Sequence, residues 1–91
     1  MMQAKKDFIL LDVRSPEEFR QIHIKGAKLL PLDQLPSRAA PDLPDRDAVI
    51  VVYCHSGARA SNAVRFLTGL GYTNVSNLGG IINWPFETER G

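Results

Sequence analysis

Cys54 is the only cysteine among the 91 residues, and its surroundings favour a reactive thiol. It follows residues 48–53, an apolar run typical of a buried strand, and precedes residues 56–61, which predict a tight turn opening into a helix. A thiol at this junction faces unpaired backbone N–H groups and the positive end of a helix dipole. Both favour the thiolate, the nucleophilic form of cysteine. We therefore expect a catalytic thiol rather than a core cysteine packed as a small apolar side chain.

The six residues from Cys54 to Arg59 form a short loop that ends in a cation. We expect the N–H groups of residues 55–59 to converge on the sulfur as an anion nest, with Gly57 supplying the backbone freedom for the curl. Arg59 offers a planar fork of donors to a bound oxyanion, and a cation is otherwise unfavourable in the first turn of a helix. The expected substrate-binding residues are His55, Ser56, Gly57, Ala58 and Arg59.

The first half of the chain predicts two strands around one helix. Residues 8–13 form an apolar run typical of a strand, and residues 27–31 predict a second, shorter one. Between them, Ser15 and Glu18 stand at the two positions of a capping box, which predicts a helix that begins after Ser15 and reaches Ile22. In residues 32–47, prolines at 36, 41 and 44 exclude one long helix and leave room for a turn or two.

The second half predicts a strand, a helix and a further strand. Residues 48–53 are the expected central strand, and residues 72–78 the last one. Between them, Gly71 is the expected end of a helix with one apolar face, formed by Ala60, Ala63, Val64, Leu67 and Leu70. Gly79 and Gly80 predict a sharp turn, and residues 81–84 a final turn of helix.

This alternation predicts a single α/β domain over residues 1–91, with its core at about 8–85 and a small parallel sheet covered by helices on both faces. Ligands bind outside the carboxyl ends of parallel strands, and Cys54 lies at such an end. Asp12 ends the first strand at the same edge. We expect Asp12 to cap loop amides rather than act as a general base, and Arg14 to pair with Glu17 or Glu18. Both Asp12 and Arg14 are therefore expected to be structural.

Composition limits the partners. The net charge is +1. The sequence has no basic stripe interleaved with aromatic residues, so nucleic-acid binding is not expected. The apolar runs are far shorter than the roughly 20 residues that span a bilayer, so no membrane association is expected. Residues 1–7 lack the apolar segment of a secretory signal, which favours the cytoplasm, or the periplasm if a leader has been removed. One cysteine and two histidines are too few for a structural zinc site, and we expect no metal or organic cofactor.

Several motifs follow one another over about residues 8–85: Asp12-Val13-Arg14, Glu17-Glu18-Phe19, His23-Ile24-Lys25-Gly26-Ala27, Tyr53 to Ser61, Leu78-Gly79-Gly80 and Trp84. Together they resemble the rhodanese family, most of all its single-domain, phage-shock-protein-E type.

The resemblance implies sulfur transfer through a persulfide on Cys54. The implied donor is a small anion such as thiosulfate, whose sulfonate end Arg59 would orient. The implied acceptor is cyanide or a thiol, including a thiol on a second protein.

Other functions remain as alternatives at this point. Cysteine-based phosphatases and arsenate reductases that resemble this fold have five residues between cysteine and arginine, whereas Cys54 and Arg59 are separated by four. The loop also lacks a carboxylate that would protonate a leaving alkoxide. A single cysteine excludes an internal thiol–disulfide couple. A non-enzymatic interaction or sulfur-carrier module is the remaining alternative, although modules of this kind typically lack the cysteine.

Overall fold

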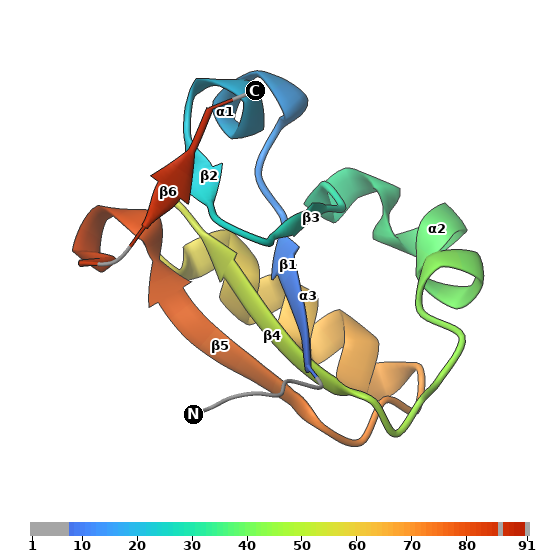
Figure 1. The fold of residues 1–91 in the computed structure, drawn as a ribbon. Helices are drawn as coiled ribbons and strands as arrows, with labels where there is room; N and C mark the ends of the chain where they lie inside the picture. The colour runs from blue at the N-terminus through green and yellow to red at the C-terminus, as the bar shows by residue number, and fades with distance from the viewer. Residues whose placement is uncertain (1–7, 86, 91) are drawn as a thin grey trace.

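The computed structural model describes residues 8–85 and 87–90, so the interpretation of residues 1–7 lies outside the described residues. At the centre is a four-stranded parallel sheet in the order β3-β1-β4-β5 (Figure 1). Its strands are β1 (Phe8–Asp12), β3 (Lys28–Leu29), β4 (Val49–Cys54) and β5 (Val75–Gly80). A separate antiparallel pair joins β2 (His23–Ile24) to β6 (Thr88–Glu89). The predicted fold class, an α/β domain built on a small parallel sheet, is confirmed.

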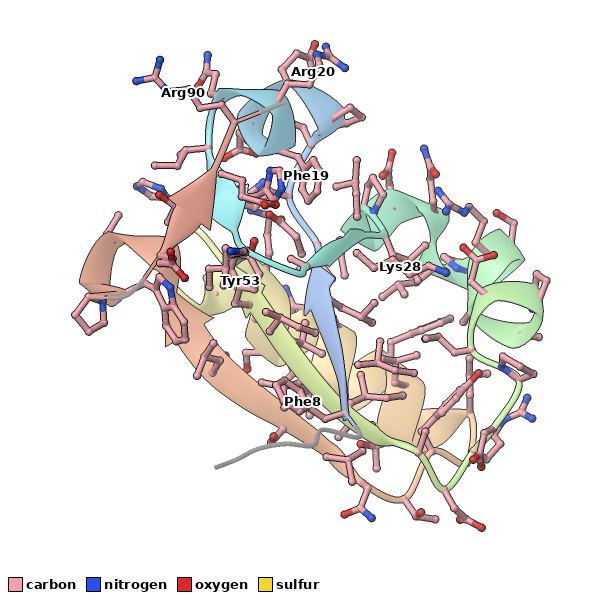
Figure 2. All side chains as sticks on the ribbon, viewed as in Figure 1. Phe8, Phe19, Arg20, Lys28, Tyr53 and Arg90 are labelled. Carbon is pink, nitrogen blue, oxygen red and sulfur yellow. The ribbon has the colours of Figure 1, made fainter. Side chains whose placement is uncertain are left out.

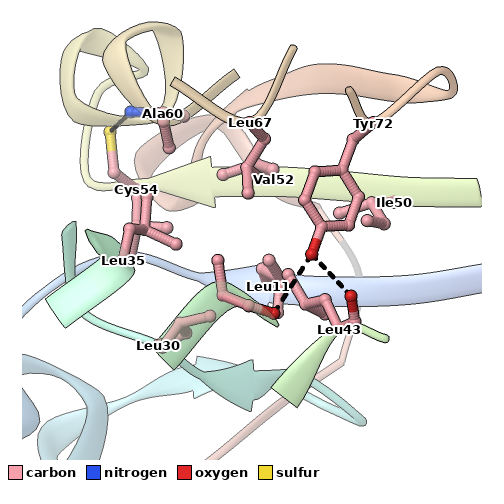
Figure 3. Close-up of a cluster of buried hydrophobic side chains, with 13 residues drawn as sticks. Leu11, Leu30, Leu35, Leu43, Ile50, Val52, Cys54, Ala60, Leu67 and Tyr72 are labelled. Carbon is pink, nitrogen blue, oxygen red and sulfur yellow. Dashed lines mark hydrogen bonds between the residues drawn. The ribbon is translucent and has the colours of Figure 1, made fainter. Parts of the chain in front are cut away.

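One face of the sheet carries the hydrophobic core, covered by α2 (Leu35–Asp42) and α3 (Ala58–Gly69) (Figure 3). Alternate residues of β1 and β4 point into this core, as the two-residue period of a strand requires. The fully buried members include Leu11, Ile50 and Val52 from the strands, Leu35 from α2 and Leu67 from α3. Among the described residues, no helix is both long and apolar enough to cross a membrane.

The opposite face is covered at the end where Asp12 and Tyr53 pair across β1 and β4. This end is covered by β2 and by the C-terminal end of α1 (Pro16–Gln21). The N-terminus of α1 has the predicted capping box between Ser15 and Glu18. Figure 2 shows Tyr53 beneath β2 and Phe8 at the other end of the sheet. Phe8 is 54% exposed, so the cover on this face is uneven.

The proline-rich stretch holds more helix than expected. A 3-10 turn, η2 (Leu32–Gln34), leads into α2, which continues through Pro41. Proline in a helix costs a backbone hydrogen bond and clashes with the preceding turn, but Pro41 lies in the last turn of α2. Burial of Leu35, Ala39 and Leu43 against the sheet offsets that cost.

Two expectations near the end of the chain were wrong. Leu70, the residue after the end of α3, is 41% exposed and does not belong to the buried face; Gly71, with φ +100°, closes the helix as predicted. Gly79 and Gly80 do not form a turn; they are the last two residues of β5 and pair with the end of β4 across a register shift. The final helical turn is a 3-10 helix, η3 (Ile81–Asn83).

Candidate active site

Cys54 is the last residue of β4, at the carboxyl edge of the sheet, and α3 begins four residues later. Its sulfur accepts hydrogen bonds from two backbone amides, Gly57 N at 3.0 Å and Ala60 N at 3.4 Å, the second of which is drawn in Figure 3. The prediction named the amides of residues 55–59; Gly57 lies within that range, whereas Ala60 belongs to the first turn of α3. The segment is curled around the sulfur, and its helix supplies one of the donors.

The cysteine side chain is only 1% exposed and belongs to the hydrophobic core. An anionic sulfur at such a depth is costly unless it is hydrogen-bonded, and the two amides provide those bonds. Burial among apolar groups and contact with two amides therefore coexist at the same atom. This combination places the thiol in the core without depriving it of partners for a negative charge.

Two glycines allow the curl. Gly57 has φ +107°, a left-handed conformation that side chains other than glycine rarely adopt. Gly80 passes so close to the loop that a Cβ on it would lie 2.6 Å from Ser56 Cα. Gly80 therefore sits in β5 because the strand packs directly against the cysteine loop, a tertiary reason that the local pattern does not contain. Asn77 in β5 also donates from Nδ2 to Gly57 O at 3.2 Å, a contact that the sequence reasoning missed.

The remaining residues of the cysteine loop lie at the surface of the protein. His55, Ser56 and Ala58 are exposed, and His55 holds the loop to η3 by accepting a hydrogen bond at its carbonyl from Ile82 N at 3.3 Å. The His55 side chain lines an open cavity of about 510 Å³ together with Glu18, Ile82 and Trp84. The loop residues are thus brought together around Cys54, while the sulfur itself contacts the amides of Gly57 and Ala60.

Arg59, the last residue of the cysteine loop, forms an ion pair with Glu18. Its two terminal nitrogens donate to the carboxylate of Glu18, at 2.7 Å and 2.9 Å, and the two side chains are 39% and 33% exposed. Hydrogen bonding from Arg59 lowers the pKa of Glu18 from 4.5 to about 2. The same hydrogen bond raises the pKa of Arg59. The cation predicted to bind a substrate anion already holds a carboxylate of the chain.

Arg14 pairs with Asp12, so the expected partners Glu17 and Glu18 were wrong. The Asp12 carboxylate accepts from Arg14 Nη2 at 2.8 Å, from Arg14 Nε at 3.0 and 3.1 Å, and from the Arg14 amide at 2.9 Å. Asp12 is 0% exposed and Arg14 3%, and a buried charge requires a charged or hydrogen-bonding partner. Asp12 was expected to cap loop amides, and its carboxylate accepts a hydrogen bond from the backbone amide of Arg14.

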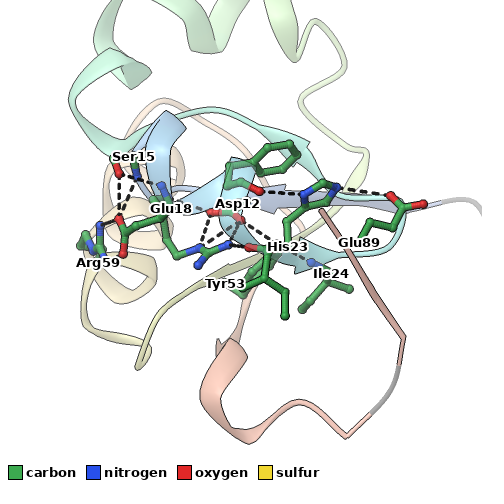
Figure 4. A network of polar contacts seen from close by, with 11 residues as sticks. Asp12, Ser15, Glu18, His23, Ile24, Tyr53, Arg59 and Glu89 are labelled. Atoms are coloured by element: carbon green, nitrogen blue, oxygen red, sulfur yellow. Dashed lines mark hydrogen bonds and ion pairs between the residues drawn. The ribbon is translucent and has the colours of Figure 1, made fainter. Parts of the chain in front are cut away.

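Tyr53 links this pair to the strand that carries the cysteine (Figure 4). Its hydroxyl donates to Asp12 at 2.7 Å and accepts from Ile24 N at 3.0 Å. Burial, together with the bond to Asp12, raises the pKa of Tyr53 well above its usual range, so the phenol stays protonated. Arg14 extends the network by donating to Ile22 O. The network ties the ends of β1 and β4 to the segment that follows α1.

His23 contacts both the end of α1 and a distant strand. One ring nitrogen lies 2.9 Å from Phe19 O at the end of α1, and the other 3.3 Å from Glu89 in β6. Because Glu89 is 66 residues away in the chain, the sequence carries no local indication of this second contact. Among residues 8–85 and 87–90, no group of three potential metal ligands lies together.

Both the sequence and the fold of the chain match those of known proteins. Residues 1–85 match the family model for the rhodanese-like domain. The chain is 39% identical over 81 residues to the thiosulfate sulfurtransferase PspE of Escherichia coli, covering 89% of this chain and 78% of that protein. It is 44% identical over 80 residues to a sulfurtransferase of Allochromatium vinosum, covering 87% and 73% of the two chains. Among solved structures, a rhodanese with anions from E. coli superimposes with a TM-score of 0.85 at 35% identity, covering 91% of this chain and 98% of that one.

Proposed function

The chain belongs to the rhodanese-like domain family and is a sulfurtransferase, and from this premise we propose that Cys54 carries the transferred sulfur as a persulfide and that thiosulfate serves as a donor. The observation that carries the proposal is the pair of amides on Cys54 Sγ at the carboxyl edge of the sheet. Preorganised N–H donors stabilise charge that develops in a reaction without having to reorient.

In the first step the Cys54 thiolate attacks the outer sulfur of thiosulfate. A new S–S bond forms to Cys54, the sulfur–sulfur bond of the donor breaks, and sulfite leaves with the electron pair of that bond. The negative charge then lies on the terminal sulfur of the persulfide, so total charge is conserved and no external oxidant is needed. Gly57 N and Ala60 N are placed to stabilise the anionic sulfur before the attack.

In the second step a thiophilic acceptor attacks the terminal sulfur. With cyanide the products are thiocyanate and the Cys54 thiolate, which returns the site to its starting state; a thiol acceptor, free or on a protein, takes the sulfur as a persulfide in the same way. Splitting the transfer into two displacements is what a covalent intermediate achieves.

The remaining site residues receive supporting roles in this proposal. The loop His55, Ser56, Gly57 and Ala58 surrounds the persulfide, and Arg59 attracts the sulfonate end of the donor. Asp12 and Arg14 hold the neighbouring loop in place through Tyr53, which directly precedes Cys54 in β4. No proton transfer is assigned to Asp12, because its carboxylate is fully engaged by Arg14 and Tyr53.

The test is intact-mass spectrometry of protein purified without reductant and then treated with thiosulfate. The wild-type protein is expected to gain the mass of one sulfur atom, and cyanide is expected to remove it with formation of thiocyanate. Cys54→Ser, checked for folding by circular dichroism, is expected to gain nothing and to lose turnover. Sulfur transfer retained by folded Cys54→Ser would overturn the proposal.

A further inference from the structure

The Glu18 carboxylate is held beside the cysteine loop by several hydrogen bonds. Its Oε1 accepts from Ser15 N at 3.0 Å and Ser15 Oγ at 3.1 Å, which completes the capping box of α1. The same oxygen accepts from Arg59 Nη1, and Oε2 accepts from Arg59 Nη2 (Figure 4). The carboxylate is therefore fixed in place by its own helix before any substrate arrives.

Glu18 binds the two terminal nitrogens of Arg59, which are the donors best suited to an anion. A guanidinium binds a carboxylate or a sulfonate most strongly through two parallel N–H donors, and Glu18 occupies one such pair on Arg59. Arg59 is 39% exposed, so its remaining donors and its charge are accessible to an incoming anion. That anion nevertheless approaches a cation whose charge is already offset by a carboxylate less than 3 Å away.

The neighbouring charges do not compensate for this. Arg59 lines an open cavity of about 490 Å³ with Arg14, Asp33 and Gln34. Arg14 is 3% exposed and bound to Asp12, so its charge is also offset, while Asp33 adds an exposed carboxylate to the cavity wall. The two arginines that line this cavity are thus each paired with a carboxylate, and Asp33 adds a third, so the cavity is not strongly cationic.

We propose that Glu18 determines donor specificity by competing with the donor for Arg59, so that the site discriminates against donors of higher negative charge. The inference rests on the proposed function, because it concerns the donor of that same sulfur transfer. The structure assigns Glu18 as an internal anion that every anionic donor must either displace or approach. Repulsion from one fixed charge grows in proportion to the charge of the donor, so a dianion is disfavoured more than a monoanion.

A pair of donors with the same reactive sulfur separates charge from shape. Thiosulfate carries two negative charges, and methanethiosulfonate, in which a methyl group replaces one sulfonate oxygen, carries one. The Cys54 thiolate attacks the outer sulfur in both; the first donor releases sulfite and the second methanesulfinate, with the electron pair of the broken bond in each case.

The experiment compares KM for the two donors in the wild type and in Glu18→Gln, with cyanide as acceptor. Removing the competing charge is expected to lower KM by about tenfold for thiosulfate and about threefold for methanethiosulfonate, because the interaction energy scales with the donor's charge. Glu17→Gln is the matched control, since Glu17 is the exposed neighbour in the same helical turn. An unchanged or higher KM for thiosulfate in Glu18→Gln would overturn the inference, as would an equal fall in Glu17→Gln.

A second variant tests whether pairing rather than charge alone is responsible. Glu18→Asp keeps the negative charge but shortens the side chain by one methylene, so it cannot hold both Nη atoms in the present geometry. The competition predicts a lower KM for thiosulfate in this variant, while an unchanged KM would contradict it. Glu18→Asp also provides the test if Glu18→Gln fails to fold.

A binding measurement separates this inference from the proposed function. Titration calorimetry of thiosulfate into Cys54→Ser, with and without Glu18→Gln, needs no turnover and is expected to show tighter binding in the double variant. If the wild type forms no persulfide, the proposed function fails. If the wild type is active and Glu18→Gln alters neither KM nor binding, only the competition is disproved.

Discussion

Two carboxylate–arginine pairs lie beside the cysteine loop, and they differ in burial. Asp12 and Arg14 are 0% and 3% exposed and are enclosed by Tyr53 and the segment after α1, whereas Glu18 and Arg59 are 33% and 39% exposed at the rim of open cavities. Breaking a buried pair leaves a charge without water or partner; breaking the outer pair leaves charges that water solvates. We therefore expect the buried pair to contribute mainly to stability and the exposed pair to affect mainly donor binding.

The largest expected effect comes from breaking the buried pair. Asp12→Ala leaves Arg14 charged and without its carboxylate in the interior, and we expect a loss of about 3–5 kcal/mol in the free energy of unfolding. Urea denaturation followed by circular dichroism measures this loss. Tyr53→Phe removes one bond to the same carboxylate and leaves Ile24 N unpaired, so a smaller loss of about 1–3 kcal/mol is expected.

The activity of the Asp12 variant distinguishes support from catalysis. At a temperature where Asp12→Ala is folded, we expect kcat per folded molecule to remain near that of the wild type, with an unchanged pH profile. A stable variant with a large fall in kcat and a shifted pH profile would contradict the structural role and would make Asp12 a proton-transfer group.

Removing the outer arginine is expected to change substrate use more than stability. Arg59→Ala deletes the cation and leaves Glu18 facing the donor, so KM for thiosulfate is expected to rise by about tenfold and KM for methanethiosulfonate by about threefold. Initial rates of thiocyanate formation measure both. Arg65→Ala, an exposed arginine farther along α3, is the control. Equal increases for the two donors would show that Arg59 does not act through its charge.

The smallest effect is the contribution of the outer pair to stability. An ion pair at this exposure contributes about 0.2–1 kcal/mol. Because the pKa of Glu18 is lowered from 4.5 to about 2 in the folded protein, this contribution is present above pH 4.5 and is lost as the pH falls toward 2. The difference in unfolding free energy between wild type and Glu18→Gln should therefore shrink between pH 5 and pH 3. A difference that grows on acidification would contradict the assignment.

Local signals in the sequence predicted most of the elements correctly. Ser15 and Glu18 form the capping box of α1, Gly71 closes α3, and the apolar runs of β1 and β4 are strands. These features depend on residues only a few positions apart, so a sequence pattern contains the whole interaction. The place of Cys54 at a strand end before a helix followed from the same local patterns.

Long-range packing decided the features that the sequence did not predict. Gly80 lies in β5 where the strand passes against the cysteine loop, and α2 crosses Pro41 because its apolar side chains are buried. Neither reason is visible in the residues next to the glycine or the proline.

The sequence alone determined that Cys54 lies at a strand end and that a helix begins beside it. Only the tertiary structure decided which carboxylate each arginine holds: Arg14 takes Asp12, two residues away, whereas Arg59 takes Glu18, which is 41 positions distant. The physical reason is that a charged side chain selects its partner by burial and distance in space. Those quantities exist only once α1 and α3 have been brought to the same edge of the sheet.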